Sequence, residues 1–232
     1  MLLLAASLSA SEQEMPSDVR LELTTLAWQH PIKGLYYING GEVQELKAYS
    51  GGFSMPIDYQ GVPIIRFYTN KESLTLPPEE RPLPNGIAKL DPTMKHSLMI
   101  FLPKSKEQFE ILIHDFSQES FPTNSCRIFN YSGLDIVFAL GDQPIIQAIA
   151  PNETVVIKQD ELADQNKMVK VQLAQQGKEA ARVVYRSTWR FDNQSRASVF
   201  VLPAPNDQSS VQMRKFVERG LRFEASKTVQ SL

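Results

Sequence analysis

The sequence predicts an all-β protein made of two tandem, related β-sandwich units. Apolar runs of strand length recur about every 8–12 positions with turn residues between them, as in β-sandwiches. No segment carries a sustained apolar stripe at helical spacing. Residues 98–103 (LMIFLP) return as residues 198–203 (SVFVLP). Each of these two segments is predicted to be the central closing strand of its unit, apolar on both faces.

The same offset relates residues outside this pair of segments. The matches are Gly41 with Gly141, Ala48 with Ala148, Gln108 with Gln208 and Phe116 with Phe216. We interpret them as an internal duplication of about 100 residues, close to the usual domain size. The predicted organisation is a leader and linker at 1–18, one repeat at 19–118, a second at 119–218 and a loose tail at 219–232.

In the first copy, alternating apolar residues predict a strand at 19–28. Strands at 35–38 and 43–49 flank Asn39-Gly40, a strong hairpin signal because both turn positions need positive φ. Further strands are predicted at 62–68, 96–102 and 109–116, with a long polar loop at 70–86. This loop is where the copies differ most, so it is a place where an individual function is expected.

In the second copy, the corresponding strands are predicted at 126–131, 135–140, 145–149, 154–158, 168–175, 181–191 and 198–202. Residues 159–167 are polar and suit a helical turn. Residues 211–221 are ambiguous between strand and helix. The match to the first copy favours a strand that ends near Phe216.

Composition restricts the partner and the compartment. Apolar residues make up 42% of the 232 residues, and the net charge of −2 gives no reason to expect a nucleic acid or an anionic membrane as partner. Cys126 is the single cysteine, so no intrachain disulfide forms. The repeat offset aligns Cys126 with Leu26 of the first copy, which predicts that Cys126 is a buried core residue.

The first ten residues, MLLLAASLSA, resemble the end of a secretory signal peptide but lack a basic segment before the apolar one. Two interpretations follow, an exported protein or a frayed apolar terminus, and we expect the extracytoplasmic one, periplasmic or secreted. No segment approaches the roughly 20 apolar residues that a membrane span needs, so none is predicted.

Two surface features are candidate binding sites. Strict alternation along 181–191 would place Arg182, Arg186 and Arg190 on one face, where they suit an anionic glycan, a phosphate or an acidic protein partner. Pairing with carboxylates on neighbouring strands is the structural alternative. Glu79, Glu80 and Arg81 lie in a proline-rich stretch that partly resembles a polyproline recognition segment. The alternative there is a stiffened surface loop.

No catalytic residue, metal site or cofactor is predicted. The sequence has no nucleophile elbow, phosphate-binding loop, dinucleotide fingerprint or zinc-protease motif. The three histidines are isolated in sequence, which predicts rim or surface positions. An alternative is a hydrolase-like enzyme at the cleft between repeats, using Asp58, Asp115, His114 and Glu119.

Residues 129–133 (FNYSG), Gly141-Asp142 and residues 150–155 (APNETV) resemble segments of bacterial exported Ig-like β-sandwich repeats. The resemblance covers residues 125–203 and, through the duplication, 20–103. It implies an exported, non-enzymatic structural or binding module whose partner is another protein or an anionic glycan. A subunit of a larger surface assembly is the remaining alternative. Asn130, Asn152 and Asn193 begin glycosylation sequons, which matter only in a glycosylating pathway.

Overall fold

The computed structural model describes residues 18–141, 144–158, 168–177, 180–190, 195–204 and 207–218. Within these ranges the chain forms sixteen β-strands and two short 3₁₀ turns. The all-β prediction is therefore confirmed. None of the described segments is a helix long and apolar enough to cross a membrane.

The chain divides into two compact units. Of the described residues, unit 1 comprises those up to Ala48 together with Met55–His114, and unit 2 comprises Tyr49–Ser54 together with those from Asp115 onward. The division falls between His114 and Asp115 rather than at the expected 118/119. Within unit 2, the Phe53 ring lies 5.3 Å from that of Phe116 and 5.5 Å from that of Phe216. These ring contacts hold the short segment Tyr49–Ser54 in unit 2.

Unit 1 has one four-stranded sheet, in the order β4-β1-β7-β8. The bounds are β1 Val19–Ala27, β4 Ile57–Gly61, β7 His96–Pro103 and β8 Phe109–Asp115. Its second layer consists of two ribbons, β2 (Ile32–Asn39) with β3 (Glu42–Ala48) and β5 (Ile64–Phe67) with β6 (Gly86–Lys89). A bridge between Tyr36 and Tyr68 joins these ribbons. The core between the layers includes Leu23, Leu35, Phe67, Ala88 and Met99.

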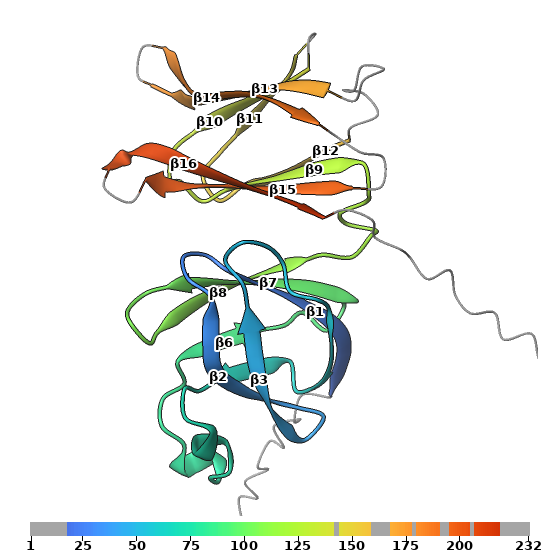
Figure 1. The fold of residues 1–232 in the computed structure, drawn as a ribbon, viewed down its shortest axis with the longest axis vertical. Coiled ribbons are helices and arrows are strands. Elements are labelled where there is room, and N and C mark those ends of the chain that lie inside the picture. The colour runs from blue at the N-terminus through green and yellow to red at the C-terminus, as the bar shows by residue number, and fades with distance from the viewer. Residues whose placement is uncertain are drawn as a thin grey trace, which may run out of the picture. The chain divides into compact units, whose positions relative to one another are not determined.

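Unit 2 consists of two four-stranded sheets that face each other, seen as two layers in Figure 1. The first sheet has the order β12-β9-β15-β16, with β9 Ser125–Asn130, β12 Thr154–Lys158, β15 Arg196–Ala204 and β16 Asp207–Glu218. The second has the order β11-β10-β13-β14, with β10 Ile136–Leu140, β11 Ile145–Ile149, β13 Met168–Gln176 and β14 Ala181–Arg190. Side chains of both sheets, such as Ile128, Phe138, Leu173 and Val199, form the core.

The topology supports the duplication. In both units the first strand pairs in parallel with the closing strand, β1 with β7 and β9 with β15. The ribbon order β3-β2-β5-β6, joined by the tyrosine bridge, repeats as β11-β10-β13-β14. As predicted, the segments 98–103 and 198–203 belong to the inner strands β7 and β15, in which Met99, Ile100, Val199 and Phe200 are all buried.

Strand register corrects one detail of the repeat alignment. Leu23 pairs with Ser97, and Cys126 pairs with Ala197, so the counterpart of Cys126 is Leu23 rather than Leu26. Both residues are fully buried in the core of their unit. The prediction that Cys126 is a core residue is confirmed, although the constant offset does not hold along the whole repeat.

Several element bounds differ from the sequence prediction. The strands β4 and β6 were not predicted, because each is short. In addition, β6 begins at the end of the loop that was predicted to span residues 70–86. Within that loop the chain forms 3₁₀ turns at Lys71–Leu74 and Pro78–Glu80. Some sequence predictions concern residues outside the described part of the chain: residues 1–17, Asp142, residues 159–167, Phe191, Asn193 and the tail 219–232.

Candidate functional site

The predicted arginine stripe is split by a β-bulge in β14. Tyr185 pairs with Leu173 and Val183 pairs with Ala174, so Val184 is an extra residue without a partner in the ladder. Val184 and Tyr185 both pack against the core. A bulge of this kind reverses the alternation of all residues before it. The expectation of three arginines on one face is therefore wrong.

Arg186 and Arg190 pair with Gln172 and Met168 and lie on the outer face. Arg182 instead pairs with Gln175, whose side chain donates a 2.7 Å hydrogen bond to the Ser209 carbonyl of the other sheet. Hydrogen bonds from Ser209, and then the positive charge of Arg182, lower the pKa of Asp207. The charge of Arg182 is therefore felt by Asp207 at the edge between the two sheets. The three arginines of β14 do not form a basic stripe on one face.

The proline-rich loop is held by its own side chains. Arg81 donates hydrogen bonds to the carbonyls of Leu76 at 3.0 Å and Leu74 at 3.2 Å. Glu79 and Glu80 are exposed in the second 3₁₀ turn. Because Arg81 is used to close the loop, this geometry fits the stiffened-loop interpretation of the segment.

The four residues of the enzyme alternative belong to different units. Asp58 and His114 lie in unit 1, and Asp115 and Glu119 lie in unit 2. Burial raises the pKa of Asp115, but hydrogen bonds from Ser117 and Ser120 and the charge of Arg127 outweigh this effect and lower it. A carboxylate with a lowered pKa is a poor general acid or base at neutral pH. No group of three or more His, Cys, Asp or Glu suited to a metal occurs among the described residues.

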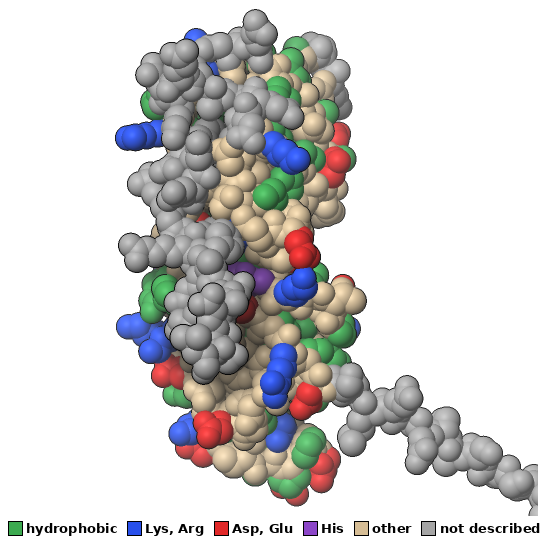
Figure 2. All heavy atoms as spheres, turned by 90° about the vertical axis from the view of Figure 1, so that its right-hand side faces the viewer, with side chains coloured by type: hydrophobic (Ala, Val, Ile, Leu, Met, Phe, Trp, Pro, Cys, Tyr) green, Lys and Arg blue, Asp and Glu red, His purple; other side chains and the backbone are tan. Residues whose placement is uncertain are grey.

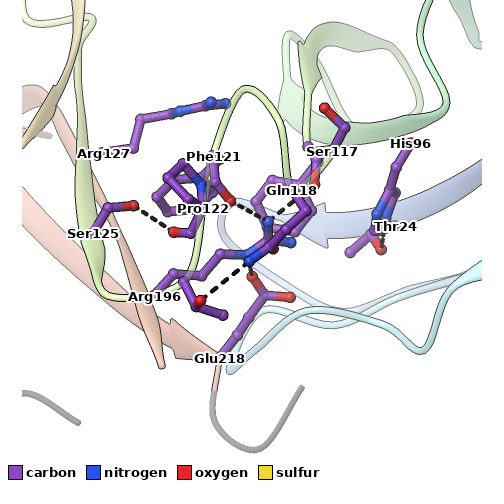
Figure 3. A network of polar contacts seen from close by, with 12 residues as sticks. Thr24, His96, Ser117, Gln118, Phe121, Pro122, Ser125, Arg127, Arg196 and Glu218 are labelled. Carbon is purple, nitrogen blue, oxygen red and sulfur yellow. Dashed lines mark hydrogen bonds and ion pairs between the residues drawn. The ribbon is translucent and has the colours of Figure 1, made fainter. Parts of the chain in front are cut away.

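Two buried arginines hold the segment that leads into unit 2. Arg196 forms a 2.6 Å ion pair with Glu218 and donates to the carbonyls of Phe116 and Phe121. Arg127 donates to the carbonyls of Asp115 and Ser120, and both guanidinium groups lie over the Phe121 ring. Figure 3 shows Arg196 directed at Glu218 in this network. Apart from Arg127 Nε, which is buried without a hydrogen-bond partner, these guanidinium groups are bonded within the fold, so we assign them a structural role.

Two other potentially reactive side chains, His96 and Cys126, are also held within the fold. Thr24 Oγ1 lies 2.8 Å from His96 Nε2, and Glu22 Oε2 lies 3.5 Å from His96 Nδ1. Burial raises the pKa of the Cys126 thiol to about 12, which suppresses the nucleophilic thiolate. Asn130, although it begins a sequon, is fully buried. It therefore cannot accept a glycan in the folded unit.

A pocket of about 700 Å³ opens at one end of unit 1. Its floor is the end of the apolar core. Leu35 and Phe101 are core residues, and Ile32 and Phe109 are partly buried against that core. The rings of Phe101 and Phe109 meet edge to face at 6.1 Å. The floor can thus take up an apolar group without exposing a buried polar atom.

Two connections form the rim of this pocket, and the parallel pairing of β1 with β7 explains why they meet. Parallel strands end at the same edge of a sheet, so the connection after Ala27 and the turn after Pro103 lie together. The Trp28 amide donates to the Phe101 carbonyl at 3.0 Å, and the Lys104 amide donates to the Gln108 carbonyl at 2.8 Å. Both connections that form the rim are therefore held by backbone hydrogen bonds.

Asn85 fixes a third side of the pocket. Its Oδ1 accepts from the Thr69 amide at 2.8 Å, and its side-chain amide donates to the Glu107 carbonyl at 2.9 Å. The Asn85 carbonyl also accepts from the Phe109 amide at 2.8 Å. A single asparagine therefore links the end of β5, the β7–β8 turn and the start of β8.

The rim carries mostly positive side chains. Lys33, Lys104 and Lys106 line the pocket, and Glu107 is the one acidic residue among the lining side chains. Lys104 forms an exposed ion pair with Glu110 at 3.6 Å. Among the described residues, Lys33 and Lys106 form no ion pair. His30 also lines this rim and is exposed, as the sequence predicted for the histidines.

The equivalent end of unit 2 is built differently. The Tyr131 amide donates to Val201, matching the Trp28 bond to Phe101 in unit 1. In unit 2, however, the buried Asn130 side chain donates to the carbonyls of Leu134, Ile149 and Ala150. These bonds tie the β9–β10 connection to the end of β11. The copies therefore diverge at the end where unit 1 has its pocket.

Sequence reasoning missed this pocket. Nothing in strand alternation indicates that β1 and β7 are parallel neighbours, and the pocket lies where these two strands end. On the face shown in Figure 2, Lys and Arg are interspersed with Asp and Glu, so charge does not gather there in a broad patch of one sign over the described residues. Protein-family models and curated proteins were both searched, and neither yields a match to the chain.

Proposed function

We propose that the protein is a non-enzymatic, extracytoplasmic binding module whose ligand site is the pocket of unit 1. The observation that carries the proposal is the pocket itself: an apolar floor with a lysine-rich rim held by backbone hydrogen bonds. Pockets with apolar walls and a few directed polar groups are the usual form of small-molecule sites.

Two further observations support binding rather than catalysis. The buried Arg127 and Arg196 and the partly buried Glu218 are hydrogen-bonded within the fold, and burial raises the pKa of the Cys126 thiol. The extracytoplasmic location is supported by residues 1–10, with their apolar run followed by small residues. Fractionation of the native host and N-terminal sequencing test this location. An intact Met1 on a cytoplasmic protein would contradict it.

The binding role is tested with the full chain and a panel of anionic, neutral and cationic alkyl and aromatic compounds. We expect some of them to shift the backbone amide resonances of the residues that line the pocket. Ile32→Trp, which places a larger side chain in the pocket, should abolish these shifts, whereas Val156→Trp on the exposed part of β12 should not. The proposal fails if no compound shifts these amides, or if a bound compound is recovered chemically converted.

A further inference from the structure

The charge and shape of the unit 1 pocket indicate which class of ligand it takes. We infer that the pocket binds an organic anion: a carboxylate or similar acidic group joined to an apolar alkyl or aromatic body. This inference rests on the proposed function and specifies its ligand. The apolar body would lie on the floor formed by Leu35, Phe101 and Phe109, and the acidic group would lie at the rim.

The apolar half of the argument comes from the floor. Phe109 and Ile32 are only partly buried, although they pack against the core. Covering apolar surface stabilises a complex by roughly 25 cal/mol per Å² before the costs of association. The floor alone would bind neutral and charged alkyl compounds equally, so it does not select the anion.

The selectivity comes from the rim. The pocket is lined by three lysines and one glutamate, and the nearby Glu110 is paired with Lys104. Lys33 and Lys106 therefore supply the positive potential from two separate elements: Lys33 lies at the start of β2, and Lys106 lies in the turn between β7 and β8. Ammonium groups above an apolar floor attract the head of an amphiphilic anion and repel that of an amphiphilic cation.

The difference between the two repeats supports a binding role for the end of unit 1 that carries the pocket. In unit 2 the buried Asn130 ties down the equivalent connection. The β1 residue that precedes Trp28 in unit 1 is Ala27, which has no polar side chain to form such bonds. The two copies therefore differ at this end. Unit 2 has a buried asparagine that hydrogen-bonds the connection, and unit 1 has an apolar pocket with lysines at its rim.

The test compares three probes with the same alkyl chain, octanoate, octan-1-ol and octyltrimethylammonium, on the full chain at low ionic strength. Binding is followed by the amide shifts of the pocket residues. We expect octanoate to bind about fivefold or more tightly than octan-1-ol, from two exposed attractions of about 0.5 kcal/mol each. Added salt should reduce this advantage, because the rim charges are exposed.

Variants separate the head group from the floor. Lys33→Gln combined with Lys106→Gln should weaken octanoate about fivefold and leave octan-1-ol unchanged. The matched control is Lys89→Gln combined with Lys158→Gln, two exposed lysines outside the pocket, which should change neither. Equal affinity for octanoate and octan-1-ol, or octanoate binding that ignores the rim substitutions, overturns the inference while the pocket remains a binding site. If none of the three probes shifts the pocket amides, the inference fails. The proposed function then fails only if the wider panel also leaves the pocket unperturbed.

Discussion

Replacing Asn130 with leucine tests how the end of unit 2 is held. Its side-chain amide donates to the carbonyls of Leu134, Ile149 and Ala150 at 2.8–3.0 Å, and its oxygen accepts from Ser132. The Leu134 and Ala150 carbonyls keep a second donor in the variant. The cost therefore falls mainly on the Ile149 carbonyl and the Ser132 amide. At about 1–3 kcal/mol for each unsatisfied group, we expect a loss of about 2–6 kcal/mol in the free energy of unfolding.

The assay is urea unfolding of the full chain, followed by the fluorescence of Trp189 in a Trp28→Phe background. Trp189 is buried in the core of unit 2 and Trp28 belongs to unit 1, so this background reports on unit 2 alone. The matched control is Asn152→Gly. Asn152 is an exposed sequon asparagine with φ of 62°, a conformation that glycine adopts without strain. A loss below about 1 kcal/mol for Asn130→Leu would refute the assigned role of the network.

A pH-dependent variant sharpens the same test. Asn130→Asp would place a carboxylate opposite the carbonyls that now accept from the amide. Burial and these carbonyls would raise its pKa above the unfolded value of about 3.9. The destabilisation is therefore smallest below that unfolded pKa and grows as the pH rises through it. A stability loss that does not change between acidic and neutral pH would contradict this arrangement.

Two further predictions concern buried groups of unit 2. Arg196→Met should cost about 3–5 kcal/mol because it leaves the largely buried Glu218 carboxylate without its 2.6 Å partner, and adding Glu218→Leu should recover part of that loss in urea unfolding. Full additivity of the two substitutions would argue against their coupling. The Cys126 thiol, with its pKa raised to about 12 by burial, should react with a disulfide reagent at pH 8 only as fast as unit 2 opens. Immediate labelling of the native protein would show that the thiol is accessible.

The β14 bulge shows where sequence reasoning stops. Alternation along residues 181–190 is a local pattern, and it predicts the strand correctly. Whether an extra residue enters the ladder depends on the partner strand, here the pairing of Leu173 with Tyr185 and of Ala174 with Val183. The single extra residue Val184 moved Arg182 to the other face. No local signal in the strand marks the bulge.

The core positions were predictable for a different reason. Apolar runs such as 98–103 and 198–203 can hardly be solvated on either face, so their place inside a sheet follows from composition and length. The hairpin at Asn39-Gly40 was also predicted, but its turn lies one residue later: Asn39 ends β2 and pairs with Glu42, and the positive φ values are those of Gly40 and Gly41, at 60° and 83°. Such elements follow from the local chemistry of the sequence.

By itself, the sequence determined the all-β class, the duplication, the strands that form the cores and the buried state of Cys126. Only the tertiary structure decided the parallel pairing of β1 with β7, the bulge at Val184 and the pocket between the connections that follow Ala27 and Pro103. The physical reason is that periodicity reports which face of a strand is buried, a local property. The identity of neighbouring strands is set by contacts between residues far apart in the chain, and the pocket exists only where such neighbours end together.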